Sequence, residues 1–115
     1  MAYVNGYAAS CPPDKKDAFI ESAKKVDGYF KEKGALRVVE CWGTDVPHGK
    51  QTDFYRAVDA NEGEVAVFGW IEWPSKEVAD AAMGAMMSDP QFADMEMVID
   101  GRKMIFGGFE VVYEI

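Results

Sequence analysis

Cysteine and histidine are scarce in this sequence, which contains only Cys11, Cys41 and His48 of these two types. Two thiols are too few for a disulfide framework, and with the single histidine they lack the spacing of a metal-binding motif. The Walker and dinucleotide-binding glycine patterns are absent too, and no predicted helix follows Gly107-Gly108. We therefore expect free thiols, no bound metal and no cofactor.

Positive charge and long apolar runs are also scarce. Twelve Lys and Arg stand against twenty Asp and Glu, and the net charge of −8 repels phosphate backbones and anionic lipid. The basic residues form no stripe with interleaved aromatic residues. No apolar run approaches the roughly 18 residues that span a bilayer, and the first residues do not have the pattern of a signal peptide. We expect a cytoplasmic protein with no nucleic-acid or membrane partner.

The remaining composition is that of an ordinary globular protein. Of the 115 residues, 49% are hydrophobic, 13% are aromatic and 28% are charged. No low-complexity tract suggests disorder, and the length is close to the commonest size of one domain. We expect a single domain over residues 1–115.

The run from Val65 to Trp73 is the most informative segment, because it is rich in strand-forming residues and apolar on both faces. Alternation places two groups of side chains on its opposite sides. One group is Val65, Val67, Gly69, Ile71 and Trp73, and the other is Ala66, Phe68, Trp70 and Glu72. Such a strand must be covered on both sides.

The order of the other elements predicts a ferredoxin-like fold. Strands are expected over residues 3–9, 35–42, 64–73 and 103–113, and helices over 14–33 and 76–87, with Asp14 and Ser75 as their N-caps. A long loop follows Gly43, with a short turn near residues 54–58. This βαββαβ order predicts an α+β domain with a four-stranded antiparallel sheet, both helices lying on one face. A second copy would cover the other face and form a dimeric α+β barrel, so we expect a homodimer.

Several segments resemble a known family when they are taken together and in order. They are residues 35–43 (ALRVVECWG), 45–50 (DVPHGK), 68–76 (FGWIEWPSK), 86–90 (MMSDP) and 100–109 (DGRKMIFGGF). In these the chain resembles the YbaA-like family of small bacterial proteins, a domain of unknown function in the dimeric α+β barrel superfamily. The resemblance implies a ferredoxin-like subunit and a homodimer, and it implies no established activity.

Candidate catalytic groups are Glu40, Glu72 and His48. Each of the two glutamates shares a strand face with a tryptophan, and contact with indole would raise the pKa of a carboxyl group toward that of a general acid or base. The alternative is that these glutamates form salt bridges, with Arg37 or Arg56, or face solvent. His48 lies in the long loop and could activate the thiol of Cys41, or it could be an ordinary surface histidine.

Trp42, Phe68 and Trp70 are candidate ligand-binding residues, because pockets for small apolar or aromatic molecules are mostly aromatic with a few polar groups. The same residues could instead form the core and the dimer interface. Two functions therefore stay open from the sequence. One is a small-molecule binding protein or cofactor-free enzyme, and the other is a non-catalytic dimeric structural or interaction module without a pocket.

Overall fold

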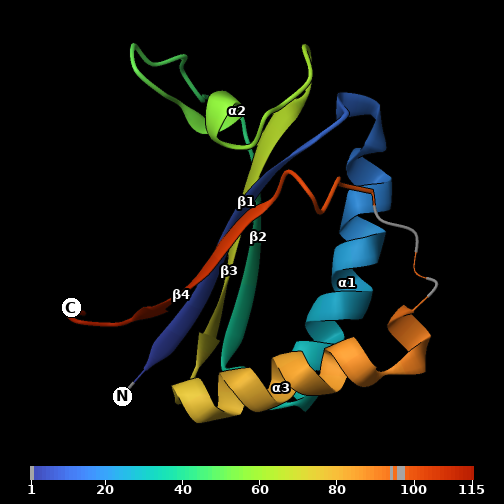
Figure 1. The fold of residues 1–115 in the computed structure, drawn as a ribbon, viewed down its shortest axis with the longest axis vertical. Coiled ribbons are helices and arrows are strands. Elements are labelled where there is room, and N and C mark those ends of the chain that lie inside the picture. The colour runs from blue at the N-terminus through green and yellow to red at the C-terminus, as the bar shows by residue number, and fades with distance from the viewer. Residues whose placement is uncertain (1, 94, 96–97) are drawn as a thin grey trace.

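The fold is an antiparallel sheet with its two long helices on one side, seen in a computed structural model that describes residues 2–93, 95 and 98–115 (Figure 1). The strands are β1 (Tyr3–Cys11), β2 (Arg37–Trp42), β3 (Val65–Trp73) and β4 (Ile105–Glu110). The helices are α1 (Lys16–Glu32), α2 (Phe54–Ala57) and α3 (Lys76–Ser88), with short 3₁₀ turns η1 (Pro13–Lys15) and η2 (Pro90–Phe92). None of the helices in this part of the chain is long and apolar enough to cross a membrane.

The strand order is β2-β3-β1-β4, and every neighbouring pair is antiparallel. This order, with α1 and α3 on one face, is the ferredoxin-like arrangement, so the predicted fold class is confirmed. β3 lies between β1 and β2, and therefore separates Cys11 from Cys41. Both cysteines are free, as expected.

The core lies between the sheet and the helices. Trp73 is fully buried at the end of β3, and its ring packs edge-on against Phe30 of α1, with centroids 5.8 Å apart. Its indole Nε1 donates a 2.8 Å hydrogen bond to Oδ1 of Asn5, which is also buried. A buried indole N–H costs free energy unless it finds such a partner. Asn5 therefore serves the core and is not a free polar group.

The predicted helix boundaries hold in part. The side chain of Ser75 accepts a hydrogen bond from the amide of Val78 and caps α3, as expected. Gly34 has φ 111° and ends α1 in the left-handed conformation that glycine favours. The prediction that Asp14 caps α1 was wrong, because Asp14 belongs to η1 and no side chain caps the first turn of α1. The two prolines before Asp14 impose this separate 3₁₀ turn.

Several strand boundaries differ from the expectation: β2, β3 and β4 begin one or two residues later, and the ends of β1 and β4 move further. β1 continues to Cys11 because its pairing with β3 persists as far as Val65. β4 ends at Glu110, and the chain beyond it leaves the sheet on the side away from the helices (Figure 1). Gly107 and Gly108 form no bulge, since the β1–β4 register runs through them without interruption. Gly108 instead permits a close approach, because a side chain there would collide with the Tyr3 hydroxyl.

The face of the sheet opposite the helices, which we call the open face, carries exposed apolar side chains. Phe68, Ile105 and Phe109 are all exposed there, Phe109 to 60%. The register places Phe109 opposite Val4 and Ile105 opposite Ala8, so these residues share one face. Apolar patches of this kind are typical of interaction sites.

Candidate functional site

A cavity of about 290 Å³ lies between the helix-covered face of the sheet and α1, and we call it the inner cavity. Side chains of α3 and of the segment after it close its other side. Most of the lining is aromatic, aliphatic or methionine. Only a few polar side chains reach it, and Glu40 is hydrogen-bonded to two of them, Tyr7 and Asp27. We call these three residues the polar cluster.

The polar cluster depends on a row of residues that crosses the sheet. Tyr7 of β1 lies opposite Gly69 of β3, and Gly69 lies opposite Glu40 of β2. The Tyr7 hydroxyl donates a 2.5 Å hydrogen bond to Oε1 of Glu40, across the intervening strand. A Cβ atom on residue 69 would lie 2.5 Å from both Glu40 Oε1 and Tyr7 Cε1. The glycine therefore provides the space in which the two side chains meet.

Asp27 of α1 brings a second carboxyl group to Glu40. Burial, a hydrogen bond with Glu40 and the negative charge of Glu40 together raise the pKa of Asp27 to about 8. Burial and the same glutamate also raise the pKa of Tyr7 above its ordinary value. A raised pKa favours the protonated form of Asp27 at neutral pH, in which it can share its proton with the neighbouring carboxylate.

This arrangement is suited to proton transfer. A carboxyl group whose pKa lies near neutral pH can give or take a proton at little cost, and an apolar lining strengthens its interaction with a bound polar group. Perturbed carboxyl groups that line a cavity are also typical of functional sites. The polar cluster is therefore the strongest candidate for chemistry in the described chain.

The two predicted glutamates lie on opposite faces of the sheet. Glu40 lies opposite Gly69 and points into the inner cavity, whereas Glu72 lies opposite Arg37 on the open face. Glu72 is 3.7 Å from the Arg37 guanidinium and accepts a 2.8 Å hydrogen bond from Trp70 Nε1. The β2–β3 register offsets the two glutamates by an odd number of positions, so their side chains do not meet. The alternative of a salt bridge with Arg37 is the arrangement that the structure has for Glu72.

The three predicted pocket aromatics are separated in the same way. Trp42 is on the helix-covered face, where it packs against Phe19 of α1 with ring centroids 5.8 Å apart. Phe68 and Trp70 are neighbours on the open face, with centroids 5.9 Å apart. Trp70 borders the inner cavity, but alternation along β3 directs its side chain to the open face. Trp42, Phe68 and Trp70 therefore do not form one pocket.

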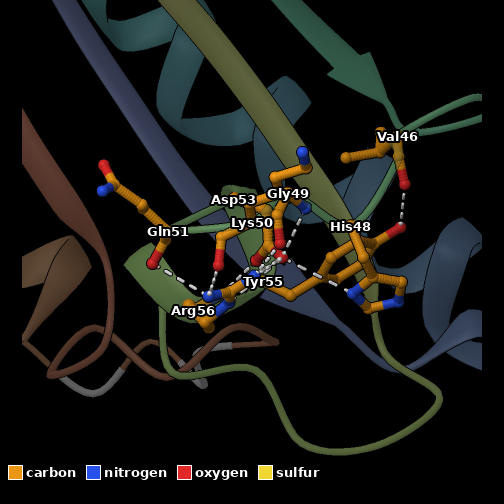
Figure 2. Close-up of polar contacts among 8 residues, drawn as sticks. All are labelled: Val46, His48, Gly49, Lys50, Gln51, Asp53, Tyr55 and Arg56. Atoms are coloured by element: carbon orange, nitrogen blue, oxygen red, sulfur yellow. Dashed lines mark hydrogen bonds and ion pairs between the residues drawn. The ribbon is translucent and has the colours of Figure 1, made fainter.

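His48 belongs to a self-contained loop (Figure 2). Its ring stacks on Tyr55, with centroids 4.7 Å apart, and its Nδ1 lies 3.5 Å from Oδ2 of Asp53. Asp53 is only 3% exposed, accepts hydrogen bonds from the amides of Arg56 and Gly49, and pairs with the Arg56 guanidinium. These hydrogen bonds lower its pKa to about 2. His48 thus contacts the groups that hold this loop together, and its predicted partnership with Cys41 gains no support.

Arg56 completes the same loop. Its guanidinium also donates to the main-chain carbonyls of Gly49, Lys50 and Gln51, and Tyr55 donates a 2.9 Å hydrogen bond to the carbonyl of Val46 (Figure 2). Such contacts fix the loop geometry, and Asp53 and Arg56 are paired with each other within it. In the part of the chain that the structure describes, no group of three His, Cys, Asp or Glu residues is placed to hold a metal ion.

Asp27 is a candidate functional residue that was not among those predicted from the sequence. The apolar residues of α1 on this side include Ala23, Val26 and Phe30. Asp27 lies four residues after Ala23 and three before Phe30, so it falls on the same face. A carboxylate among apolar residues on one helix face indicates a partly buried acidic group, and this pattern can be read from the sequence.

Solved structures define the class of the protein. A dimeric ferredoxin-like protein from an uncultured marine organism matches with a TM-score of 0.65 and 12% identity, over 99% of this chain and 98% of that one. SnoaB, a cofactor-independent oxygenase from Streptomyces nogalater, matches with a TM-score of 0.63 and 11% identity, over 98% of this chain and 96% of that one. At these identities the likeness shows the fold alone: an α+β ferredoxin-like protein.

Sequence relatives give the family. The family described as a protein of unknown function, DUF1428, matches residues 2–101. The uncharacterised protein YbaA of Escherichia coli K12 is 55% identical over 116 residues, covering 99% of each chain, and YbaA of Shigella flexneri matches equally well. The chain belongs to the DUF1428 family, which confirms the resemblance to YbaA-like proteins.

We predict that Gly69→Ala separates Tyr7 from Glu40. The added methyl group would lie 2.5 Å from each of them, so their hydrogen bond must break or the strands must shift. The free energy of unfolding should fall by about 1 to 3 kcal/mol, measured by chemical denaturation. Gly28→Ala is the matched control, since nothing lies within 4 Å of its Cβ position and alanine favours the helix. Equal stability of the native protein and Gly69→Ala would contradict the close packing.

We also predict a pH signature for Asp27. Its pKa of about 8 in the folded protein exceeds its ordinary value of 3.8. The stability it contributes is therefore fully present below pH 3.8 and is lost as pH rises toward 8. Asp27→Asn should remove this loss, so the variant should gain stability relative to the native protein between pH 4 and 8, by about 1 to 3 kcal/mol. Chemical denaturation of both proteins at several pH values would measure this gain. If their free energies of unfolding changed in parallel with pH, a raised pKa of Asp27 would be excluded. Asp80→Asn, on the exposed side of α3, is the control.

Proposed function

We propose that the protein binds a small molecule with an apolar body and one polar group in the inner cavity, as a ligand-binding protein or a cofactor-free enzyme. The observation that carries this proposal is the position of the polar cluster, Tyr7, Glu40 and Asp27, on the wall of an otherwise apolar cavity. Binding sites for small molecules have this composition, in which apolar groups supply contact area and a few polar groups fix orientation.

The polar cluster lowers the free energy of unfolding at neutral pH, which favours a functional role for it rather than a purely structural one. Holding two carboxyl groups beside each other in a partly buried site raises the pKa of Asp27 and works against stability at neutral pH. An apolar residue at position 27 would pack against the same cavity without this cost. Asp27 and Glu40 are therefore proposed to hold and move a proton on the polar group of the ligand.

The fold is compatible with either form of the proposal. SnoaB, which shares it, is a cofactor-independent oxygenase, so proteins with this architecture can be enzymes without a cofactor. That comparison is one of fold and assigns no reaction here. The alternative of a structural module without a ligand predicts that the inner cavity binds nothing.

The open face supports a homodimer as the functional form. Phe68, Ile105 and Phe109 expose apolar surface that a single subunit leaves in water. A two-fold pairing of these faces would bury each patch against its copy. The structural neighbour with the same fold is described as dimeric, which agrees with this pairing.

Ligand binding is tested by filling the inner cavity. Ala23 of α1 lines it, so Ala23→Phe should occupy the space that a ligand would use. In a thermal-shift screen of small aromatic and aliphatic compounds, the native protein should gain about 2.7 kcal/mol with a ligand at a hundred times its Kd. Ala23→Phe should lose that gain, whereas Ala81→Phe on the exposed side of α3 should keep it. A screen without hits, or a hit unaffected by Ala23→Phe, would refute the proposal.

The homodimer is tested by placing a charge on the open face. Phe109→Asp should convert a dimer into a monomer at micromolar concentration, measured by sedimentation equilibrium, because burying an unpaired carboxylate costs several kcal/mol. Met87→Asp is the control, since Met87 is equally apolar and exposed but lies on α3. A native protein that sediments as a stable monomer would exclude the dimer.

A further inference from the structure

The charge of the inner cavity identifies the class of its ligand, an inference that rests on the proposed function. We infer that the ligand is an organic cation, a protonated amine on an aromatic or aliphatic body, whose ammonium group contacts Glu40 and Asp27. The inference comes from the charges of the lining residues and from the chemistry of the surfaces around them.

The charges on the described lining are of one sign. Glu40 and Asp27 are acidic, and no Lys, Arg or His is among the described residues that line the inner cavity. The nearby basic residues lie outside it. Lys16 Nζ is 5.7 Å from the centroid of the Trp42 ring, and Lys25 Nζ is 5.7 Å from that of Phe92, where it also donates to the Gln91 carbonyl. The carboxyl pair thus has a hydrogen-bond donor in Tyr7 but no cation.

An uncompensated negative charge favours a cation over other ligands. A carboxylate in a partly desolvated site loses hydration, and a positive ligand restores the lost interaction more fully than a neutral donor can. An anionic ligand would meet like charge at short distance, with no basic side chain to balance it. Among ligands of equal size, the inner cavity should therefore bind a cation most tightly and an anion most weakly.

The rest of the lining suits the body of such a cation. Rings of Phe19, Phe30 and Phe106 contribute to the wall, and aromatic faces attract ammonium groups through their quadrupole. Met83, Met86 and Met104 add polarizable thioethers, which adapt to irregular apolar shapes. Anionic ligands gain nothing from these electron-rich surfaces.

The experiment compares three probes that share a phenylethyl body and differ in charge. They are 2-phenylethylamine, which is a cation at pH 7, 2-phenylethanol, which is neutral, and 3-phenylpropanoate, which is an anion. Titrations of the full chain, followed by calorimetry or NMR, should give a Kd for the amine about tenfold or more below that of the alcohol, and no binding of the propanoate. Glu40→Gln should raise the amine Kd about tenfold and raise the alcohol Kd by a much smaller factor, because the alcohol loses one hydrogen-bond acceptor but no ion pair.

The controls separate this inference from the proposed function. Glu77→Gln, on the exposed surface of α3, should leave all three affinities as in the native protein. Thermal unfolding without a probe shows whether the Glu40→Gln variant is folded. If the variant is unfolded, the three affinities of the native protein alone test the inference. Equal or tighter binding of the alcohol or the propanoate would overturn the cation and leave the ligand site standing. Binding of no probe at millimolar concentration would overturn both.

Discussion

The central strand β3 imposes the constraint on which the rest of the structure depends. It pairs on both edges, with β1 and β2, and both of its faces are apolar, so the sheet needs cover on both sides. The helices supply one cover, with Val67 and Trp73 fully buried beneath them. On the other side Phe54 of α2 packs edge-on against Phe68, with ring centroids 6.3 Å apart, and Phe68 stays exposed. The inner cavity lies on the face that the long helices cover, and the exposed apolar patch lies on the other face.

The fold could be predicted from the sequence because its signals are local and periodic. The alternation in residues 64–73, the cap at Ser75 and the left-handed Gly34 each indicate an element or its end, and the structure has all three. The errors lie where a neighbouring element overrides the local signal. The two prolines beside Asp14 form a separate turn, and pairing with β3 extends β1 to Cys11.

The candidate site could be predicted only in part because it depends on register. The sequence shows which residues of a strand share a face, but it does not show how the faces of two strands align. Glu40 was singled out because it shares a strand face with a tryptophan, and in the structure its neighbours are Tyr7 and Asp27 rather than Glu72. Trp42, Phe68 and Trp70 were grouped by residue type, and the β2–β3 register separates them.

Gly69 explains how one strand can serve two surfaces without conflict. Gly69 has no side chain on the helix-covered face, so Tyr7 and Glu40 can meet over it. The adjacent Phe68 and Trp70 point to the open face. The sheet therefore separates the polar cluster from the apolar patch by the thickness of one strand layer. Because alternation assigns neighbouring residues to opposite sides, a substitution on the inner cavity wall can leave the open face unchanged, and the reverse holds too. A larger residue at position 69 would couple them, since it would displace the strands that present both.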